Sequence, residues 1–122
     1  MIDNATGTPA ISVIVPCYNV EAYIDRALQS LRGQTFEDFE IIAVDDGSTD
    51  DTGARLRWWA QREPRLRIHG QENRGLYLAR LCSIAQARAP WVTFIDADDE
   101  LEPGHFVTSM STRFVRCPRT GQ

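Results

Sequence analysis

The sequence predicts an α/β domain built on a mostly parallel sheet of about four strands flanked by helices. Short apolar runs of strand length, such as Ile11–Val15 and Ile41–Val44, alternate with segments whose apolar residues recur at helical spacing. This alternation is typical of parallel strands joined by helical crossovers. The apolar runs also end abruptly in polar residues, and open parallel sheets bind ligands outside the carboxyl ends of their strands. The fold class therefore also predicts where a binding site would lie.

The first half of the chain accounts for two strands and two helices. Between the first two apolar runs, the residues at helical spacing are Ile24, Ala27, Leu28 and Leu31. Gly33 follows them, and glycine is common at helix C-termini. A second helix should begin within Thr49–Thr52, where capping residues abound, and end before Pro64. Trp58 and Trp59 lie on this helix and are interpreted as packing side chains rather than ligand-stacking ones.

The second half predicts two further strands. Leu66–Ile68 reads as a short edge strand, and Trp91–Ile95 as a buried one. A third helix is expected over about 75–87, and a short helix after Pro103, because proline suits a first helical turn. Residues 1–10 should form a flexible lead-in and residues 108–122 an irregular tail, which leaves a single domain over residues 11–107.

Composition excludes several classes of function. The net charge of -4 argues against general nucleic-acid binding, because that affinity comes mainly from basic side chains. The chain has no lysine, so the phosphate-binding loop of ATPases is excluded. Its 3 cysteines fit neither a disulfide framework nor a zinc site, which favours the cytoplasm, or the cytoplasmic face of a membrane. No apolar stretch approaches the length of about 20 residues that a membrane span needs.

Carboxylates follow two of the predicted strands. Asp96, Asp98 and Asp99 come directly after one apolar run, and Asp45 and Asp46 after another. Clustered carboxylates beside a buried strand repel one another, and a bound divalent cation relieves that cost. A solvated acidic turn that caps the next helix is the simpler interpretation of the first cluster alone. The second pair, at the same expected edge of the sheet, favours a ligand site.

Three other site types fail on specific residues. Receiver domains of response regulators need a lysine beside their aspartates, and this chain has none. A calcium loop starting at Asp96 would need glycine and glutamate where Leu101 and Val107 stand. A dinucleotide-binding turn needs a glycine-rich motif after the first strand, where Pro16–Glu21 stands instead.

Five motifs, in this order, resemble the donor-binding half of family 2 glycosyltransferases, which have the GT-A fold. They are ISVIVPCYN, LRGQTF, FEIIAVDDGSTDDT, QENRGLYLAR and WVTFIDADDE, within residues 11–106. The resemblance implies a Rossmann-like sheet with strand order 3-2-1-4. It also implies a nucleotide-sugar, by family habit a UDP-sugar, lying over the strand ends, and a role in polysaccharide biosynthesis.

The resemblance also implies site residues. The donor-binding set is Pro16, Tyr18, Asn19, Asp45, Asp46, Arg80, Asp96, Ala97 and Asp98. Tyr18 would lie against the base, and Asp46 would accept a hydrogen bond from its ring N–H. Asp96 and Asp98 match the DxD motif: Asp98 would bind Mn²⁺ or Mg²⁺ directly, and Asp96 would hold the ribose and the metal's water shell. Arg80 would reach the diphosphate or brace an aspartate, although Leu81 and Cys82 depart from the family pattern there.

Family members continue into an acceptor-binding half that supplies the catalytic base, and neither is found in these 122 residues. The expectation is therefore a donor-binding fragment of an inverting transferase whose acceptor is a glycan, lipid or protein hydroxyl. Without a base, transfer would lose a contribution of roughly 10²- to 10⁴-fold. The alternative is a non-catalytic nucleotide-binding module, or one that depends on a partner for the missing half.

Overall fold

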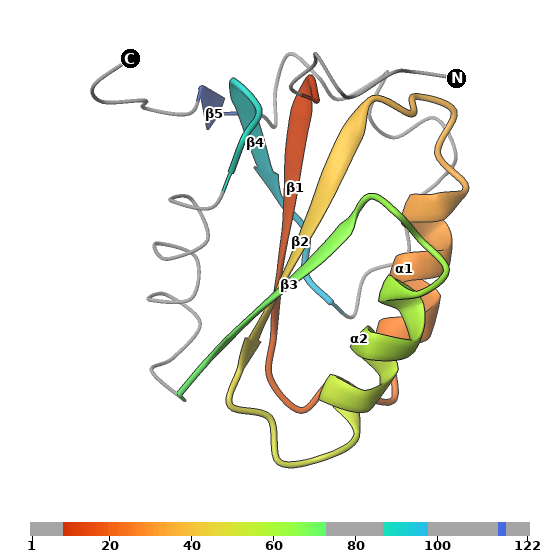
Figure 1. Cartoon of the computed structure of the whole chain (residues 1–122), viewed down its shortest axis with the longest axis vertical. Helices are drawn as coiled ribbons and strands as arrows, with labels where there is room; N and C mark the ends of the chain where they lie inside the picture. Colours follow the sequence, from red (N-terminus) through yellow and green to blue (C-terminus); the bar gives the residue numbers. More distant parts are fainter. Residues whose placement is uncertain (1–8, 73–86, 98–114, 117–122) are drawn as a thin grey trace.

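The structure is a computed structural model that describes residues 9–72, 87–97 and 115–116. The elements are β1 (Ile11–Cys17), α1 (Ile24–Arg32), β2 (Phe39–Asp46), α2 (Thr52–Ala60), β3 (Leu66–Gln71), β4 (Trp91–Phe94) and β5 (Val115–Arg116). The strands form one sheet in the order β3-β2-β1-β4-β5 (Figure 1). The pairs β1–β2, β1–β4 and β2–β3 are all parallel. The predicted α/β class and the strand order 3-2-1-4 are confirmed.

The sheet differs from the prediction at one edge. Residues 108–122 were expected to be irregular, yet β5 lies within them and pairs antiparallel with β4. A strand of two residues is too short to produce a periodic pattern, so the sequence carries no signal for it. The lead-in over 1–8, residues 75–86 of the expected third helix and the helix after Pro103 lie outside the described residues. Among the residues that are described, no helix has the length and apolarity to span a bilayer.

Helices α1 and α2 lie side by side on one face of the sheet (Figure 1). The buried apolar side chains of α1 are the four that the helical spacing predicted: Ile24, Ala27, Leu28 and Leu31. Gly33 ends α1, and its N–H donates to the carbonyl of Gln29 at 3.1 Å. Trp59 of α2 is 4% exposed, whereas Trp58 is 39% exposed. Trp59 therefore packs in the core, whereas Trp58 lies at the protein surface.

Trp59 provides a stability prediction, because its indole Nε1 donates to Asp25 Oδ1 at 2.8 Å and links α2 to α1. Trp59→Phe should lower the free energy of unfolding by about 1–2 kcal/mol through the lost hydrogen bond and volume. Trp58→Phe is the matched control and should change it by less than about 0.5 kcal/mol. Urea denaturation of both variants measures the difference, and equal losses would contradict the assigned packing.

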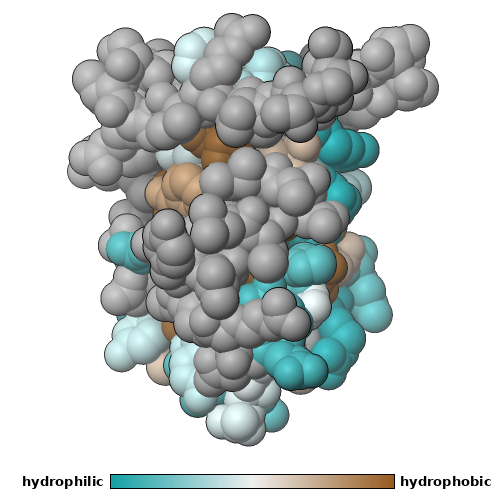
Figure 2. All heavy atoms as spheres, turned by 90° about the vertical axis from the view of Figure 1, so that its left-hand side faces the viewer, coloured by the Kyte–Doolittle hydropathy of each residue, from teal (hydrophilic) through white to brown (hydrophobic). Residues whose placement is uncertain are grey.

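A second apolar cluster lies on the opposite face of the sheet. It contains Ile14, Ile42, Val44, Ala87 and Val92, with Phe94 packed against it. Figure 2 turns this side of the molecule toward the viewer, and hydrophobic surface is visible on it among the described residues. Both faces of β1 and β2 are therefore buried, as their near-continuous apolar runs require.

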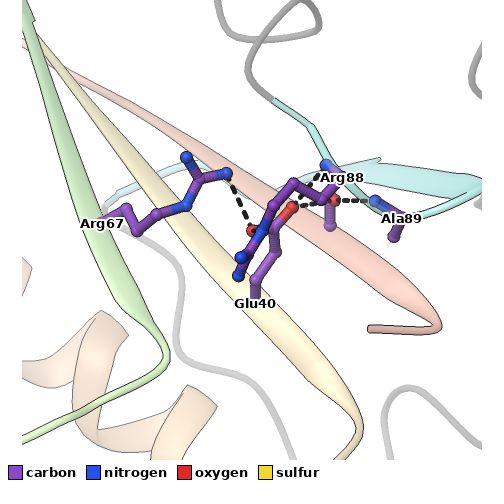
Figure 3. A network of polar contacts seen from close by, with 5 residues as sticks. Glu40, Arg67, Arg88 and Ala89 are labelled. Atoms are coloured by element: carbon purple, nitrogen blue, oxygen red, sulfur yellow. Dashed lines mark hydrogen bonds and ion pairs between the residues drawn. The ribbon is translucent and has the colours of Figure 1, made fainter. Parts of the chain in front are cut away.

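A buried polar cluster lies on this second face, near the amino ends of β1 and β2 (Figure 3). Glu40 Oε2 accepts hydrogen bonds from Ser12 Oγ at 2.5 Å and from the Arg88 backbone N–H at 2.7 Å. Glu40 Oε1 accepts from Arg67 Nη2 at 2.8 Å and from Arg88 Nε at 3.0 Å. Ser12 Oγ in turn accepts from the Ala89 N–H at 3.1 Å. One carboxylate thus joins β1, β2, β3 and the segment that leads into β4.

Candidate functional site

The candidate site lies at the carboxyl ends of β1, β2 and β4, which are neighbours in the sheet. The loops after β1 and β2 lie together at the lower end of the molecule in Figure 1. Hydrophilic residues cover the same lower end in Figure 2. This edge carries Tyr18 and Asn19 after β1, Asp45 and Asp46 at the end of β2, and Asp96 after β4. The structure therefore brings together the predicted site residues that it describes.

The loop after β1 exposes an aromatic ring and binds the neighbouring loop. Tyr18 is 38% exposed, so its ring remains available for stacking. Asn19 has a left-handed backbone with φ of 52°. Its Oδ1 accepts from the N–H groups of Thr49 at 2.8 Å and Asp50 at 3.3 Å. Asn19 is therefore already engaged in holding the β2–α2 loop.

Asp45 lies in register with Cys17 and supports the turn that follows β2. Its Oδ1 accepts from the Ser48 N–H at 3.0 Å, and a Cβ added at Gly53 would meet its Oδ2 at 3.1 Å. Burial, together with the nearby Asp45 carboxylate, raises the pKa of the Cys17 thiol to about 12. Cys17 is therefore a protonated packing residue and not a nucleophile at neutral pH.

Asp46 is 1% exposed and is held by a residue that sequence reasoning did not select. Gln71, opposite Asp46 in the β2–β3 register, donates from Nε2 to Asp46 Oδ1 at 2.8 Å. Gln71 Oε1 is buried without a hydrogen-bond partner. The strand prediction stopped at Ile68, whereas β3 continues to Gln71. Extending the predicted strand by three residues would have included Gln71, but its position opposite Asp46 follows only from the register that the structure shows.

Asp96 is exposed and Ala97 is 4% exposed, directly after β4. The N–H of Ile95 still donates to the Ile14 carbonyl at 2.9 Å, so this segment stays beside β1. Pro16 is buried two residues further along β1 and has no N–H to donate, consistent with the end of β1–β4 pairing at Phe94. The predicted residues Arg80 and Asp98 lie outside the described residues.

The described edge is acidic and suits a hard cation. Asp45, Asp46 and Asp96 lie at the strand ends, and Asp50 and Asp51 follow in the β2–α2 loop. Within residues 9–72, 87–97 and 115–116, no three His, Cys, Asp or Glu side chains come together as a metal site. Carboxylate oxygens match the ligand preference of Mn²⁺ and Mg²⁺, so Asp96 fits a site completed by other ligands.

The mostly parallel open sheet with helices packed against it places the chain in the α/β class, with Tyr18, Asp46 and Asp96 at its strand ends. The model of Glycosyl transferase family 2 matches residues 12–117. The chain belongs to this family, as the sequence motifs predicted.

Related proteins agree with this assignment. The chain is 43% identical over 98 residues to EpsH of Bacillus subtilis, which is named as a glycosyltransferase. This alignment covers 80% of this chain and 28% of EpsH. It aligns with Staphylococcus aureus TarS in complex with UDP at a TM-score of 0.75 and 33% identity, over 83% of this chain and 31% of that one. The mannosyltransferase PcManGT of Pyrobaculum calidifontis, solved with GDP-Man and Mn²⁺, gives a TM-score of 0.75 and 30% identity. That alignment covers 85% of this chain and 31% of PcManGT. The chain thus spans less than a third of each of these proteins.

Proposed function

We propose that this chain is the donor-binding part of an inverting glycosyltransferase that takes a UDP-sugar together with Mn²⁺ or Mg²⁺. The observation that carries the proposal is the meeting of Tyr18, Asp46 and Asp96 at three adjacent strand ends. A base needs a flat partner and a matching hydrogen-bond acceptor, and a diphosphate needs a cation on an edge this acidic. The complexes of TarS with UDP and of PcManGT with GDP-Man and Mn²⁺ support this choice of ligands.

The proposal gives a distinct task to each of these predicted site residues, including Arg80 and Asp98, which lie outside the described residues. The Tyr18 ring stacks on the base, and the Asp46 carboxylate accepts the base's ring N–H. Asp96 would hold the ribose hydroxyls and metal-bound water, and Asp98 would be the direct metal ligand. Pro16, Asp45 and Ala97 shape the backbone around the donor, and Arg80 meets the diphosphate. The metal, when bound, neutralises charge on the leaving nucleoside diphosphate. The sugar would then pass to an acceptor hydroxyl of a glycan, lipid or protein.

Thermal unfolding with UDP and Mn²⁺, added separately and together, tests the proposal. Ligand at about 100 times its dissociation constant should add about 2.7 kcal/mol of stability, which raises Tm by several degrees. The increase should require both components, because the acidic edge disfavours the diphosphate without a cation. Asp98→Asn should abolish it.

Asp38→Asn is the matched control for this experiment. Asp38 directly precedes β2, at the amino ends of the strands and away from the candidate site. The same Asp-to-Asn substitution there should leave the ligand-dependent increase in Tm intact. A folded wild-type chain that shows no shift with both components would refute donor binding. A shift that persists in Asp98→Asn would refute the assigned metal ligand.

A further inference from the structure

The loops after β1 and β2 are joined by hydrogen bonds that form an interloop clamp, made by Asn19–Glu21 with Ser48–Thr52. The Asn19 N–H donates to Ser48 Oγ at 3.0 Å, and its Oδ1 receives the Thr49 and Asp50 N–H groups. These contacts join residues about 30 positions apart in the sequence. One asparagine therefore bonds to three consecutive residues of the neighbouring loop.

The clamp continues on both sides of Asp50. The Val20 N–H donates to Thr52 Oγ1 at 2.8 Å, and the Asp51 N–H donates to Glu21 Oε1 at 3.0 Å. Asp50 accepts from the Thr52 hydroxyl at 2.6 Å and from the Thr52 N–H at 2.9 Å. Thr52 is fully buried, which ties the clamp to the first turn of α2.

The backbone at Asn19 indicates that this position is held for a purpose. A φ of 52° is uncommon for a residue with a Cβ, and asparagine is among the few that tolerate it. Such conformations persist where the surrounding structure holds them, and they concentrate at functional sites. Asn19 directly follows the exposed Tyr18 and holds the loop that directly follows Asp46.

We infer that Asn19 is a positioning residue that fixes Tyr18 relative to Asp46 before a nucleotide arrives, an inference that rests on the proposed function. A preformed spacing spares the ligand the entropy of ordering two loops. On this view the carboxamide acts through the β2–α2 loop and not through a direct contact with the diphosphate. A defect at Asn19 should therefore weaken every ligand that carries the base, with or without phosphate.

The test measures ligand affinity in the Asn19→Gly and Asn19→Asp variants of the full 122-residue chain, at a temperature well below the Tm of each variant. Glycine keeps the left-handed backbone but removes the acceptor, so affinity for both uridine and UDP–Mn²⁺ should fall by about 10-fold. Aspartate keeps an acceptor for the Thr49 and Asp50 N–H groups, so it should restore uridine affinity to within about 3-fold of wild type. Titration calorimetry measures both ligands.

Two outcomes would overturn the inference. Unchanged affinities in Asn19→Gly, with a lowered Tm, would make Asn19 a purely structural residue. Loss confined to UDP, with uridine unaffected, would make it a diphosphate ligand instead.

Amide hydrogen exchange separates this inference from the proposed function. In the ligand-free Asn19→Gly variant, the N–H groups of Thr49 and Asp50 should lose protection while those within β2 keep it. Retained protection would refute the clamp, whatever the chain binds. If the wild-type chain binds neither uridine nor UDP, the proposed function fails and the positioning role fails with it, while exchange still decides whether the clamp exists.

Discussion

Glu40→Gln is expected to lower the free energy of unfolding by about 3 kcal/mol. Glu40 is 2% exposed and accepts from Ser12, from Arg67 and twice from Arg88. Glutamine offers one acceptor oxygen and turns an NH₂ group toward the remaining donors, which leaves buried donors unpaired. Removing one partner of a buried ion pair costs about 3–5 kcal/mol. The lower end applies because the Arg67 and Arg88 side chains are 38% and 58% exposed and can turn toward water.

Glu37→Gln is the control for this prediction, because Glu37 is exposed. Its contact with Arg65 is made by the backbone carbonyl, which the substitution leaves unchanged. Urea denaturation near pH 7 should separate the two variants by most of the 3 kcal/mol. A Glu40→Gln protein as stable as Glu37→Gln would mean that water replaces the carboxylate at no cost.

The same comparison has an expected pH dependence. Burial alone would raise the pKa of Glu40, but hydrogen bonds from Ser12, Arg88 and Arg67 outweigh it and hold the pKa below its ordinary value. Folding therefore favours the charged form. Its contribution is complete above the unfolded-state pKa of about 4.3, and it is lost as the pH falls through the folded-state value. The difference in free energy of unfolding between wild type and Glu40→Gln should therefore become smaller below about pH 4.

Elements with a strong local pattern were predictable from the sequence. The four buried residues of α1 follow directly from helical spacing, and Gly33 marks the end of that helix. Glu40 shows the limit of local patterns. It directly precedes the predicted apolar run Ile41–Val44, and its charge is typical of an exposed residue, yet it lies within β2 and is buried. Its partners Ser12 and Arg88 are 28 and 48 residues away, so no local pattern reveals the cluster.

The candidate site likewise contains features that a local sequence pattern predicts and contacts that it does not. The strand ends with their carboxylates could be predicted, because apolar runs that stop at aspartates are visible in the sequence. The pairing of Asn19 with Thr49, and of Gln71 with Asp46, could not, since each contact depends on which strands lie side by side and in what register. Motif resemblance predicted that Asn19 is a donor-binding residue. The structure adds that its carboxamide oxygen is already bound to the neighbouring loop.

Glu40 and Asp46 lie on the same face of β2, because six residues separate them along a strand with a two-residue period. At one end a buried carboxylate accepts from donors in three other segments of the chain. At the other end, the Asp46 carboxylate receives Gln71 and belongs to the proposed donor site. Substitutions at the two ends should therefore have different consequences: loss of folding stability at Glu40 and loss of binding at Asp46.

Asp46→Asn is expected to lower the affinity for UDP–Mn²⁺ by about 10- to 100-fold, with a much smaller effect on folding. Asparagine keeps one oxygen, which can still accept from Gln71 Nε2 as Asp46 Oδ1 does. Its Nδ2 then faces the proposed ring N–H of uracil, so a hydrogen bond to a charged acceptor is replaced by two donors that oppose each other. Such a bond contributes about 1.5–3 kcal/mol, which corresponds to the expected loss. Titration calorimetry gives the affinity, and urea denaturation confirms that the variant is folded.

CDP distinguishes a contact with the base from a general effect of charge. Cytosine has no N–H at ring position 3, so the wild-type chain should prefer UDP to CDP, and Asp46→Asn should lose most of that preference. If Asp46 merely shaped the local field, removing its negative charge would strengthen the binding of both diphosphates equally. Asp38→Asn, at the opposite edge of the sheet, should keep both the affinity and the preference. An Asp46→Asn protein that still prefers UDP as strongly as wild type would assign recognition of the base to another residue.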